Sequence, residues 1–187
     1  QLKVLSKYGI GLDKIDVGHT EEVGLPLTFC PGVNHTTVAE HTFGLMLGLF
    51  RNLVEEANHT RAGEWTRLTG NEIMGKTIGI VGLGRIGREV ALRAKAFGMK
   101  IIGYDIYWPE AFAEEQGITR CGSMAEVFSS ADILSLHNNL TDETHSMVNA
   151  ESIATMKDGV VLLNCARGEL VDSTAMAEAL NAGKVGG

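Results

Sequence analysis

Gly82-Leu83-Gly84-Arg85-Ile86-Gly87 is the stretch that decides the fold, because it is a complete G-x-G-x-x-G sequence in the required context. The apolar residues 77–81 before it predict a strand, and residues 85–97 after it predict a helix that Gly98 ends. A glycine hexapeptide alone is a weak signal. Strand, turn and helix in this order favour a dinucleotide site on a parallel α/β sheet.

Each glycine of this turn has a separate physical task. Gly82 makes the tight turn, Gly84 lets the backbone approach a pyrophosphate, and Gly87 lets the helix pack closely on the strand. The backbone N–H groups of Arg85 and Ile86 have no helical acceptors, so they point at phosphates from the positive end of the helix. We therefore expect all five residues to bind the cofactor.

An acidic residue follows the second predicted strand, residues 100–104. Asp105 lies 18 residues after Gly87 (105 − 87), which agrees with the acid expected about 20 residues on to bind the adenosine ribose. No basic residue adjoins it at Ile106 or Tyr107, so nothing would neutralise a 2′-phosphate. This favours NAD over NADP. The alternative is a glycine turn without a ligand, with Asp105 as a cap at the end of the strand.

The remainder of the chain after residue 76 alternates between apolar strands and helices. That alternation predicts a Rossmann-type, doubly wound parallel sheet that is covered on both faces. Further strands are expected at 132–136 and 159–163, and helices at 109–116, 123–128, 152–157 and 172–181.

The region before residue 76 is different. Short strands are predicted at 2–6 and 27–29, followed by one long helix at 37–62. Gly44 and Gly48 lie four residues apart in this helix, which indicates dense packing against a neighbour or, as a second choice, a subunit interface. Residues 64–75 read as a connector, with Trp65 expected to anchor it.

Composition excludes several classes of protein. The 187 residues suffice for one domain and a remainder, and the net charge of −7 argues against a nucleic-acid partner. The longest apolar run, 43–50, is too short to cross a membrane, and no secretory signal opens the chain. Three cysteines are an odd number without a zinc pattern, which favours the reducing cytoplasm. We predict no metal site.

An arginine follows the last predicted strand, at the sheet edge where ligands bind. Arg167 could hold a carboxylate and polarise the carbonyl beside it, although a capping role is equally compatible with its position. Cys165 is expected to be buried or to act through its backbone, because no histidine partner adjoins it. His137 ends another strand at this edge, and positioning a loop or contacting the cofactor is favoured over acting as a general base.

Four motifs together resemble those of the D-isomer-specific 2-hydroxyacid dehydrogenases, and among these the sequences of the phosphoglycerate dehydrogenase branch are the most similar. They occur in the family's order over essentially the whole chain. The motifs are Gly9-Ile10-Gly11-Leu12-Asp13-Lys14-Ile15-Asp16, Val38-Ala39-Glu40, the glycine hexapeptide at 82–87, and Asn164-Cys165-Ala166-Arg167-Gly168.

The resemblance implies an NAD-dependent oxidoreductase that converts a D-2-hydroxy acid to a 2-oxo acid. Residues 1–35 would belong to a partial, flavodoxin-like substrate domain, and residues 36–187 to an NAD-binding Rossmann domain truncated at its C-terminus. The glycine-bearing helix at 37–62 leads us to expect a homodimer. The alternative is an NADH-sensing corepressor-like module without turnover, and formate or phosphite are further substrate classes.

The resemblance also implies roles for single residues. Arg167 would be catalytic, and Asn138 would contact the ribose on the nicotinamide side. The remaining implied cofactor contacts are Cys165, Ala166, Arg167 and Ile10, and the implied substrate contacts are Gly9, Ile10, Gly11 and Arg67.

The chain departs from the family pattern in three places. Asn139 stands in a loop where the family usually has proline, and the first half of the substrate domain would precede Gln1. The family's catalytic glutamate and histidine would follow Gly187. We therefore expect the chain to be a fragment of a longer enzyme.

Overall fold

The computed structural model describes residues 2–187, so Gln1, the start of the predicted segment 1–35, lies outside the described residues. The larger part of the structure is built on a five-stranded sheet in the order β5-β4-β3-β6-β7, in which every neighbouring pair of strands is parallel. This confirms the predicted Rossmann-type sheet. The strands are β3 (Thr77–Val81), β4 (Lys100–Tyr104), β5 (Thr119–Arg120), β6 (Ile133–Leu136) and β7 (Val161–Asn164).

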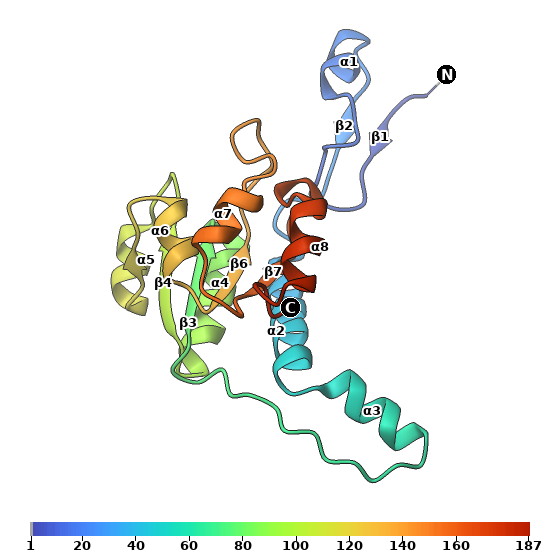
Figure 1. The fold of residues 1–187 in the computed structure, drawn as a ribbon. Helices are drawn as coiled ribbons and strands as arrows, with labels where there is room; N and C mark the ends of the chain where they lie inside the picture. The colour runs from blue at the N-terminus through green and yellow to red at the C-terminus, as the bar shows by residue number, and fades with distance from the viewer. Residues whose placement is uncertain (1) are drawn as a thin grey trace.

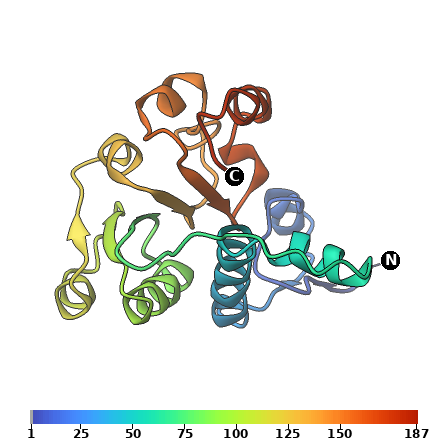
Figure 2. The same ribbon diagram turned by 60° about the horizontal axis from the view of Figure 1, so that its bottom comes forward.

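Helices cover both faces of this sheet (Figure 2). Because side chains alternate along a strand, Ile80 of β3 belongs to the core under one helix layer, while Val81 belongs to the core under the other. One layer contains α2 (His35–Phe50), α4 (Arg85–Ala96) and α5 (Glu110–Gln116). The other contains α6 (Met124–Ser130), α7 (Ala150–Thr155) and α8 (Ser173–Asn181). A 3-10 helix, η1 (Gly168–Leu170), lies between β7 and α8 in the chain.

Two helix starts illustrate how local polar groups set these bounds. Asp172 caps α8 as predicted, since its Oδ1 accepts hydrogen bonds from the N–H groups of Thr174 and Ala175 at 2.9 and 3.1 Å. Helix α7 begins earlier than predicted. Its cap is Asn149, which forms a reciprocal capping box with Ser152, so Ser152 is the third residue of the helix rather than its start.

A small unit stands apart from the sheet at the N-terminal end (Figure 1). Strand β1 (Leu5–Ser6) pairs in parallel with β2 (Leu27–Thr28), and α1 (Val17–Glu22) connects them. Helix α1 was not predicted from the sequence. Asp16 starts this helix by accepting a hydrogen bond from the N–H of His19 at 2.8 Å.

The single long helix predicted at 37–62 is wrong, because the structure has two helices there, α2 (His35–Phe50) and α3 (Leu53–Arg61). Asn52 separates them with a left-handed backbone at φ 53°. Asparagine adopts this conformation more readily than most residues, since its short polar side chain reduces the cost. Phe43 and Met46 of α2 are buried in the core beside α4.

Beyond the break, α3 and the connector 62–75 form an arm that projects from the body (Figure 1). Helix α3 buries none of its residues. Trp65 is fully exposed, so its predicted anchoring role is wrong. A Cβ on Gly44 or Gly48 would meet nothing within 4 Å, so the predicted dense packing at these glycines does not occur between the described residues 2–187.

Among those same residues, the structure contains no helix that combines the length and the apolar character needed to span a membrane.

Candidate cofactor and substrate site

The candidate site begins where the strand order reverses, between β3 and β6. Gly82 follows β3 and His137 follows β6 at the same sheet edge. A Cβ on Gly82 would lie 2.7 Å from the carbonyl carbon of His137 and 2.7 Å from the backbone nitrogen of Asn138, and the φ of Gly82 is +93°. Only glycine fits this position without moving the neighbouring chain. Such a reversal point is where open parallel sheets bind ligands.

The N-terminus of α4 opens toward this point. Gly84 is its N-cap and provides no side-chain cap, and the N–H of Arg88 donates to the Gly84 carbonyl at 3.0 Å. A Cβ on Gly84 would meet nothing within 4 Å, whereas one on Gly87 would collide with the carbonyl oxygen of Gly82. The middle glycine therefore borders open space, and the third glycine lets the helix pack on the turn.

Asp105 faces the same turn from the end of β4. Its Oδ2 accepts a hydrogen bond from the N–H of Leu83 at 2.6 Å, and its Oδ1 accepts one from the N–H of Tyr107 at 2.7 Å. The carboxylate is thereby fixed beside the glycine turn, with lone pairs left for another donor. Ile106 and Tyr107 are exposed, and neither provides a positive charge.

The end of β6 brings two incompletely bonded polar side chains to the site. Ser135 is fully buried, and its Oγ lies 2.8 Å from Nε2 of His137. Burial lowers the pKa of His137 from 6.5 to about 4, so the ring is neutral near pH 7. Nδ1 of His137 and Oδ1 of Asn138 are buried and find no hydrogen-bond partner within the described chain. Buried polar atoms without a partner are uncommon in folded proteins.

Arg167 follows β7 and contacts the N-terminal segment. Its Nε donates to Oδ2 of Asp13 at 2.7 Å, and its Nη2 lies 2.7 Å from the same oxygen. The guanidinium lowers the pKa of Asp13 below its usual value of 3.8, chiefly through the hydrogen bond. A Cβ on Gly11 would lie 2.6 Å from Nη2 of Arg167, so the predicted glycine turn and the predicted catalytic arginine are adjacent.

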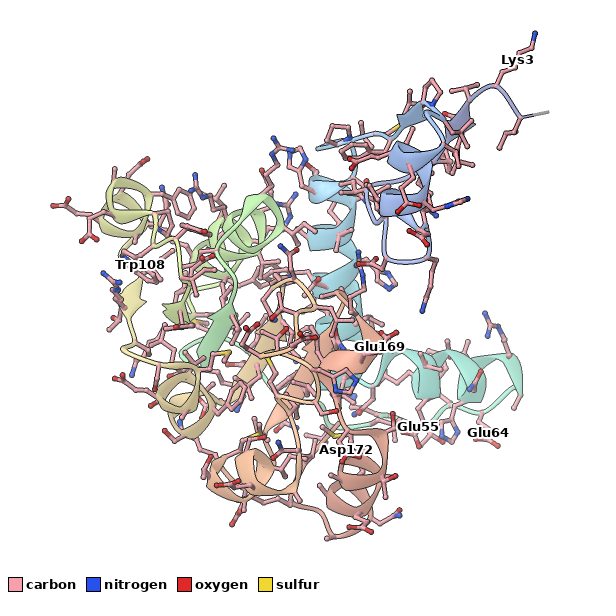
Figure 3. All side chains as sticks on the ribbon, turned by 90° about the horizontal axis from the view of Figure 1, so that it is seen from above. Lys3, Glu55, Glu64, Trp108, Glu169 and Asp172 are labelled. Carbon is pink, nitrogen blue, oxygen red and sulfur yellow. The ribbon has the colours of Figure 1, made fainter. Side chains whose placement is uncertain are left out.

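The loop that carries Arg167 is held by Asn164. Its Nδ2 donates to the carbonyl of Arg167 at 2.8 Å, and its Oδ1 accepts from the N–H of Ala166 at 3.0 Å. Figure 3 shows Glu169 just beyond this loop. Cys165 is partly buried and borders a groove of about 410 Å³, lined by Thr37, Val38, His41, Leu45, Asn164 and Cys165.

The structure does not bring every predicted residue to this edge. Gly9 and Ile10 belong to the turn beside Arg167, whereas Arg67 belongs to the connector 62–75. This connector runs below the sheet in Figure 1. Another cavity, of about 430 Å³, lies at the opposite edge, bordered by Lys76, Asp132 and Lys157. For residues 2–187, no three histidine, cysteine, aspartate or glutamate side chains are grouped so as to hold a metal ion.

Two residues of this edge were not assigned by the sequence analysis. Asp13 was quoted only as part of a motif, although its position two residues after Gly11 is a signal that it lies near the same turn. Ser135 reads as an ordinary position in an apolar strand. Its contact with His137 follows from two residues on the same side of one strand, which the i, i+2 spacing does indicate.

Comparison with known proteins agrees with this geometry. Residues 43–187 match the family model described as D-isomer specific 2-hydroxyacid dehydrogenase, NAD binding domain. The chain is 44% identical over 187 residues to the D-3-phosphoglycerate dehydrogenase of Methanocaldococcus jannaschii, covering 99% of this chain and 36% of that protein.

Solved structures give the same result. The apo-structure of D-lactate dehydrogenase from Escherichia coli matches with a TM-score of 0.92 and 34% identity, covering 98% of this chain and 58% of that one. The D-lactate dehydrogenase from Aquifex aeolicus, complexed with NAD and lactic acid, matches with a TM-score of 0.88 and 36% identity over 99% of this chain and 56% of that one. The chain spans between 36% and 60% of the length of three curated relatives.

Proposed function

Because the chain belongs to the D-isomer specific 2-hydroxyacid dehydrogenase family, we propose that it forms the NAD-binding part of an enzyme that oxidises a D-2-hydroxy acid. The hydroxy acid would lose a hydride from C2 to NAD and a proton from its hydroxyl, giving a 2-oxo acid, NADH and H⁺. When bound, the nicotinamide supplies the hydride acceptor. The chain itself would orient the two reactants.

The glycine turn is the observation that carries this proposal, because its shape fits a dinucleotide. Gly84 borders open space, and the start of α4 has no side-chain cap. The N–H groups of Arg85 and Ile86 would donate to the pyrophosphate at the positive end of the helix. Asp105 would accept hydrogen bonds from the adenosine ribose, and its negative charge favours NAD over NADP.

The buried polar atoms after β6 fit the other half of the cofactor. Oδ1 of Asn138 would accept from a hydroxyl of the ribose on the nicotinamide side, which satisfies an acceptor that has no partner within the described chain. His137 is neutral and bonded to Ser135, so we assign it a positioning role rather than that of the base. Cys165 and Ala166 would contact the carboxamide end through their backbone.

Arg167 would act at the substrate. A guanidinium can bind a carboxylate and stabilise negative charge that develops on the C2 oxygen, an effect that is strongest where water is excluded. The N–H groups of the turn formed by Gly9, Ile10 and Gly11 would donate to the same carboxylate. Gly11 is adjacent to the guanidinium, which supports this joint role.

The substrate that we favour is a D-3-phosphoglycerate-like acid, because the 44% identical relative has that activity in its name. Lactate dehydrogenases among the matching structures make D-lactate the second choice. Arg67 supports neither, since within this chain it lies on the arm. We further propose that residues 1–35 belong to a substrate domain, that residues 36–187 form the cofactor domain, and that the enzyme acts in the cytoplasm.

We also propose a homodimer that covers the arm and the outer face of α2. Leu53, Val54 and Trp65 of the arm expose at least half of their surface, and no residue of α3 is buried. Gly44 borders open space on α2. Exposed apolar side chains on a projecting arm are typical of an interface. Trp65→Ser together with Leu53→Ser should convert a dimer to a monomer in light scattering, and an unchanged mass would contradict this interface.

The proposed activity is tested with the protein as its gene encodes it. Oxidation of NADH is followed with phosphohydroxypyruvate, hydroxypyruvate, glyoxylate and pyruvate, and Arg167→Leu is the matched variant. We expect turnover of at least one acid and a loss of about 10³-fold in kcat/KM in the variant, because one positioned donor contributes about that factor. NADH binding without turnover of any acid would instead favour an NADH-sensing module.

A further inference from the structure

The contact between Arg167 and Asp13 joins two parts of the chain that are 154 residues apart. Both Nε and Nη2 of the guanidinium approach one carboxylate oxygen, Oδ2, at 2.7 Å. Asp13 therefore holds one lateral edge of the planar guanidinium rather than its end. A side chain as long as arginine has many rotamers, and a contact of this kind selects one of them.

The guanidinium of Arg167 keeps N–H donors that could bind a substrate. The guanidinium of Arg167 has five N–H bonds. Asp13 accepts the hydrogen bond of Nε at 2.7 Å and makes an ion-pair contact with Nη2, and the carbonyl of Ala166 accepts a hydrogen bond from Nη1 at 3.1 Å. At least one N–H bond on Nη1 and one on Nη2 are left. These two atoms form the end of the fork, which matches two parallel oxygens of a planar acceptor.

The backbone around the ion pair restricts it further. A Cβ on Gly11 would lie 2.6 Å from Nη2 of Arg167 and 2.9 Å from Oδ2 of Asp13. The pair thus packs directly against the glycine turn, and any larger residue at position 11 would push into both partners. The carboxylate and the guanidinium can pack against the turn in this way because residue 11 is glycine.

Folding stability does not explain this contact well. The side chains of Asp13 and Arg167 are 43% and 37% exposed, and ion pairs that are open to water contribute little to stability. The next residue provides a comparison, because Lys14 reaches Glu169 of the same loop at 3.5 Å with a side chain that is 89% exposed. Lys14 also links the N-terminal segment to the loop, but it does not touch the guanidinium.

We propose that Asp13 is a positioning residue, which holds the Nε edge of Arg167 so that the Nη1–Nη2 end faces the carboxylate and C2 carbonyl oxygens of a 2-oxo acid. This rests on the proposed function. The alternative is that Asp13 competes with the substrate. In that case its carboxylate binds the donors of Arg167 that the substrate needs, and an anionic substrate must displace it. The two donors left on Nη1 and Nη2 favour positioning, since the substrate needs no bond that Asp13 holds.

The test compares Asp13→Ala, Asp13→Glu and the control Lys14→Ala in the protein as its gene encodes it. For the best 2-oxo acid, we expect Asp13→Ala to lower kcat/KM by about 10- to 100-fold, because a misplacement of about 1 Å has an effect of that order. The KM for NADH should change less than twofold. Asp13→Glu should recover part of the loss, and Lys14→Ala should stay within twofold of the parent.

Binding of oxamate, a planar analogue of a 2-oxo acid, to the NADH complex separates failure of this proposal from failure of the proposed function. Calorimetry should show weaker binding by Asp13→Ala and unchanged binding by Lys14→Ala. If the parent protein binds oxamate and Asp13→Ala binds it equally or more tightly, the positioning role is wrong and the function stands. If the parent protein turns over none of the four acids and binds no oxamate, the proposed function fails, and the positioning role fails with it.

Discussion

Lowering the pH should destabilise the protein through one histidine at the end of β6. The pKa of His137 falls from 6.5 to about 4 on folding, because burial disfavours the charged ring. Its Nδ1 has no contact with solvent and no partner within the described residues, so the folded protein offers a proton on that atom no compensation. The folded state therefore binds fewer protons than the unfolded state, and stability falls as the pH drops.

The size of the effect follows from these two pKa values. At pH 5 the unfolded histidine is about 97% protonated and the folded one about 10%, so His137 destabilises the fold by about 2 kcal/mol relative to pH 7. The sign follows from the direction of the shift, because the folded state disfavours the protonated ring. The free energy of unfolding keeps its full value above pH 6.5 and decreases progressively as the pH falls to about 4.

Urea unfolding at pH 7 and pH 5 measures this effect when the parent protein is compared with His137→Gln. Glutamine retains a polar group near Ser135 and does not titrate, and all other ionisable groups contribute equally to both proteins. We expect the parent protein to lose about 2 kcal/mol more than the variant between these two pH values. Equal losses would refute the claim that this ring is held neutral by burial.

Three further predictions concern the glycine turn. Gly84→Ala should leave the Tm within about 2 °C of the parent, since its Cβ meets open space, but should weaken NADH binding at least tenfold. Gly18→Ala on α1, where a Cβ makes only an ordinary contact at 3.6 Å, is the control, and equal NADH affinity of both variants in calorimetry would contradict the site. Gly87→Ala should destabilise the fold by about 3 kcal/mol, because its Cβ collides with the Gly82 carbonyl. An unchanged urea midpoint would contradict this packing. Asp105→Ala should weaken NADH binding severalfold and reduce the preference over NADPH, whereas a preserved preference in parallel titrations would remove Asp105 from the ribose site.

The central strands and the glycine turn were predictable because local sequence determines them. β3 and β4 have the predicted bounds, since each is a short apolar run closed by a turn residue or an acid. The turn at Gly82 could also be predicted, because a positive φ and a close approach of another backbone both require glycine. Its position opposite His137 follows from the strand order of such sheets.

Other features depend on contacts that no local pattern contains. The break at Asn52 interrupts a run of good helix formers, and the two-residue strands β1 and β2 exist through their pairing with each other. Trp65 was expected to anchor the connector, but its side chain is fully exposed on the arm. The pair of Asp13 and Arg167 spans 154 residues, so its geometry became visible only in the folded chain.

A crystal structure of the protein with NADH tests the central claim most directly. We expect the diphosphate to lie within hydrogen-bonding distance of the N–H groups of Arg85 and Ile86, and the adenosine ribose hydroxyls to donate to the carboxylate of Asp105. Electron density for the dinucleotide elsewhere, or Asp105 directed away from the ribose, would contradict it.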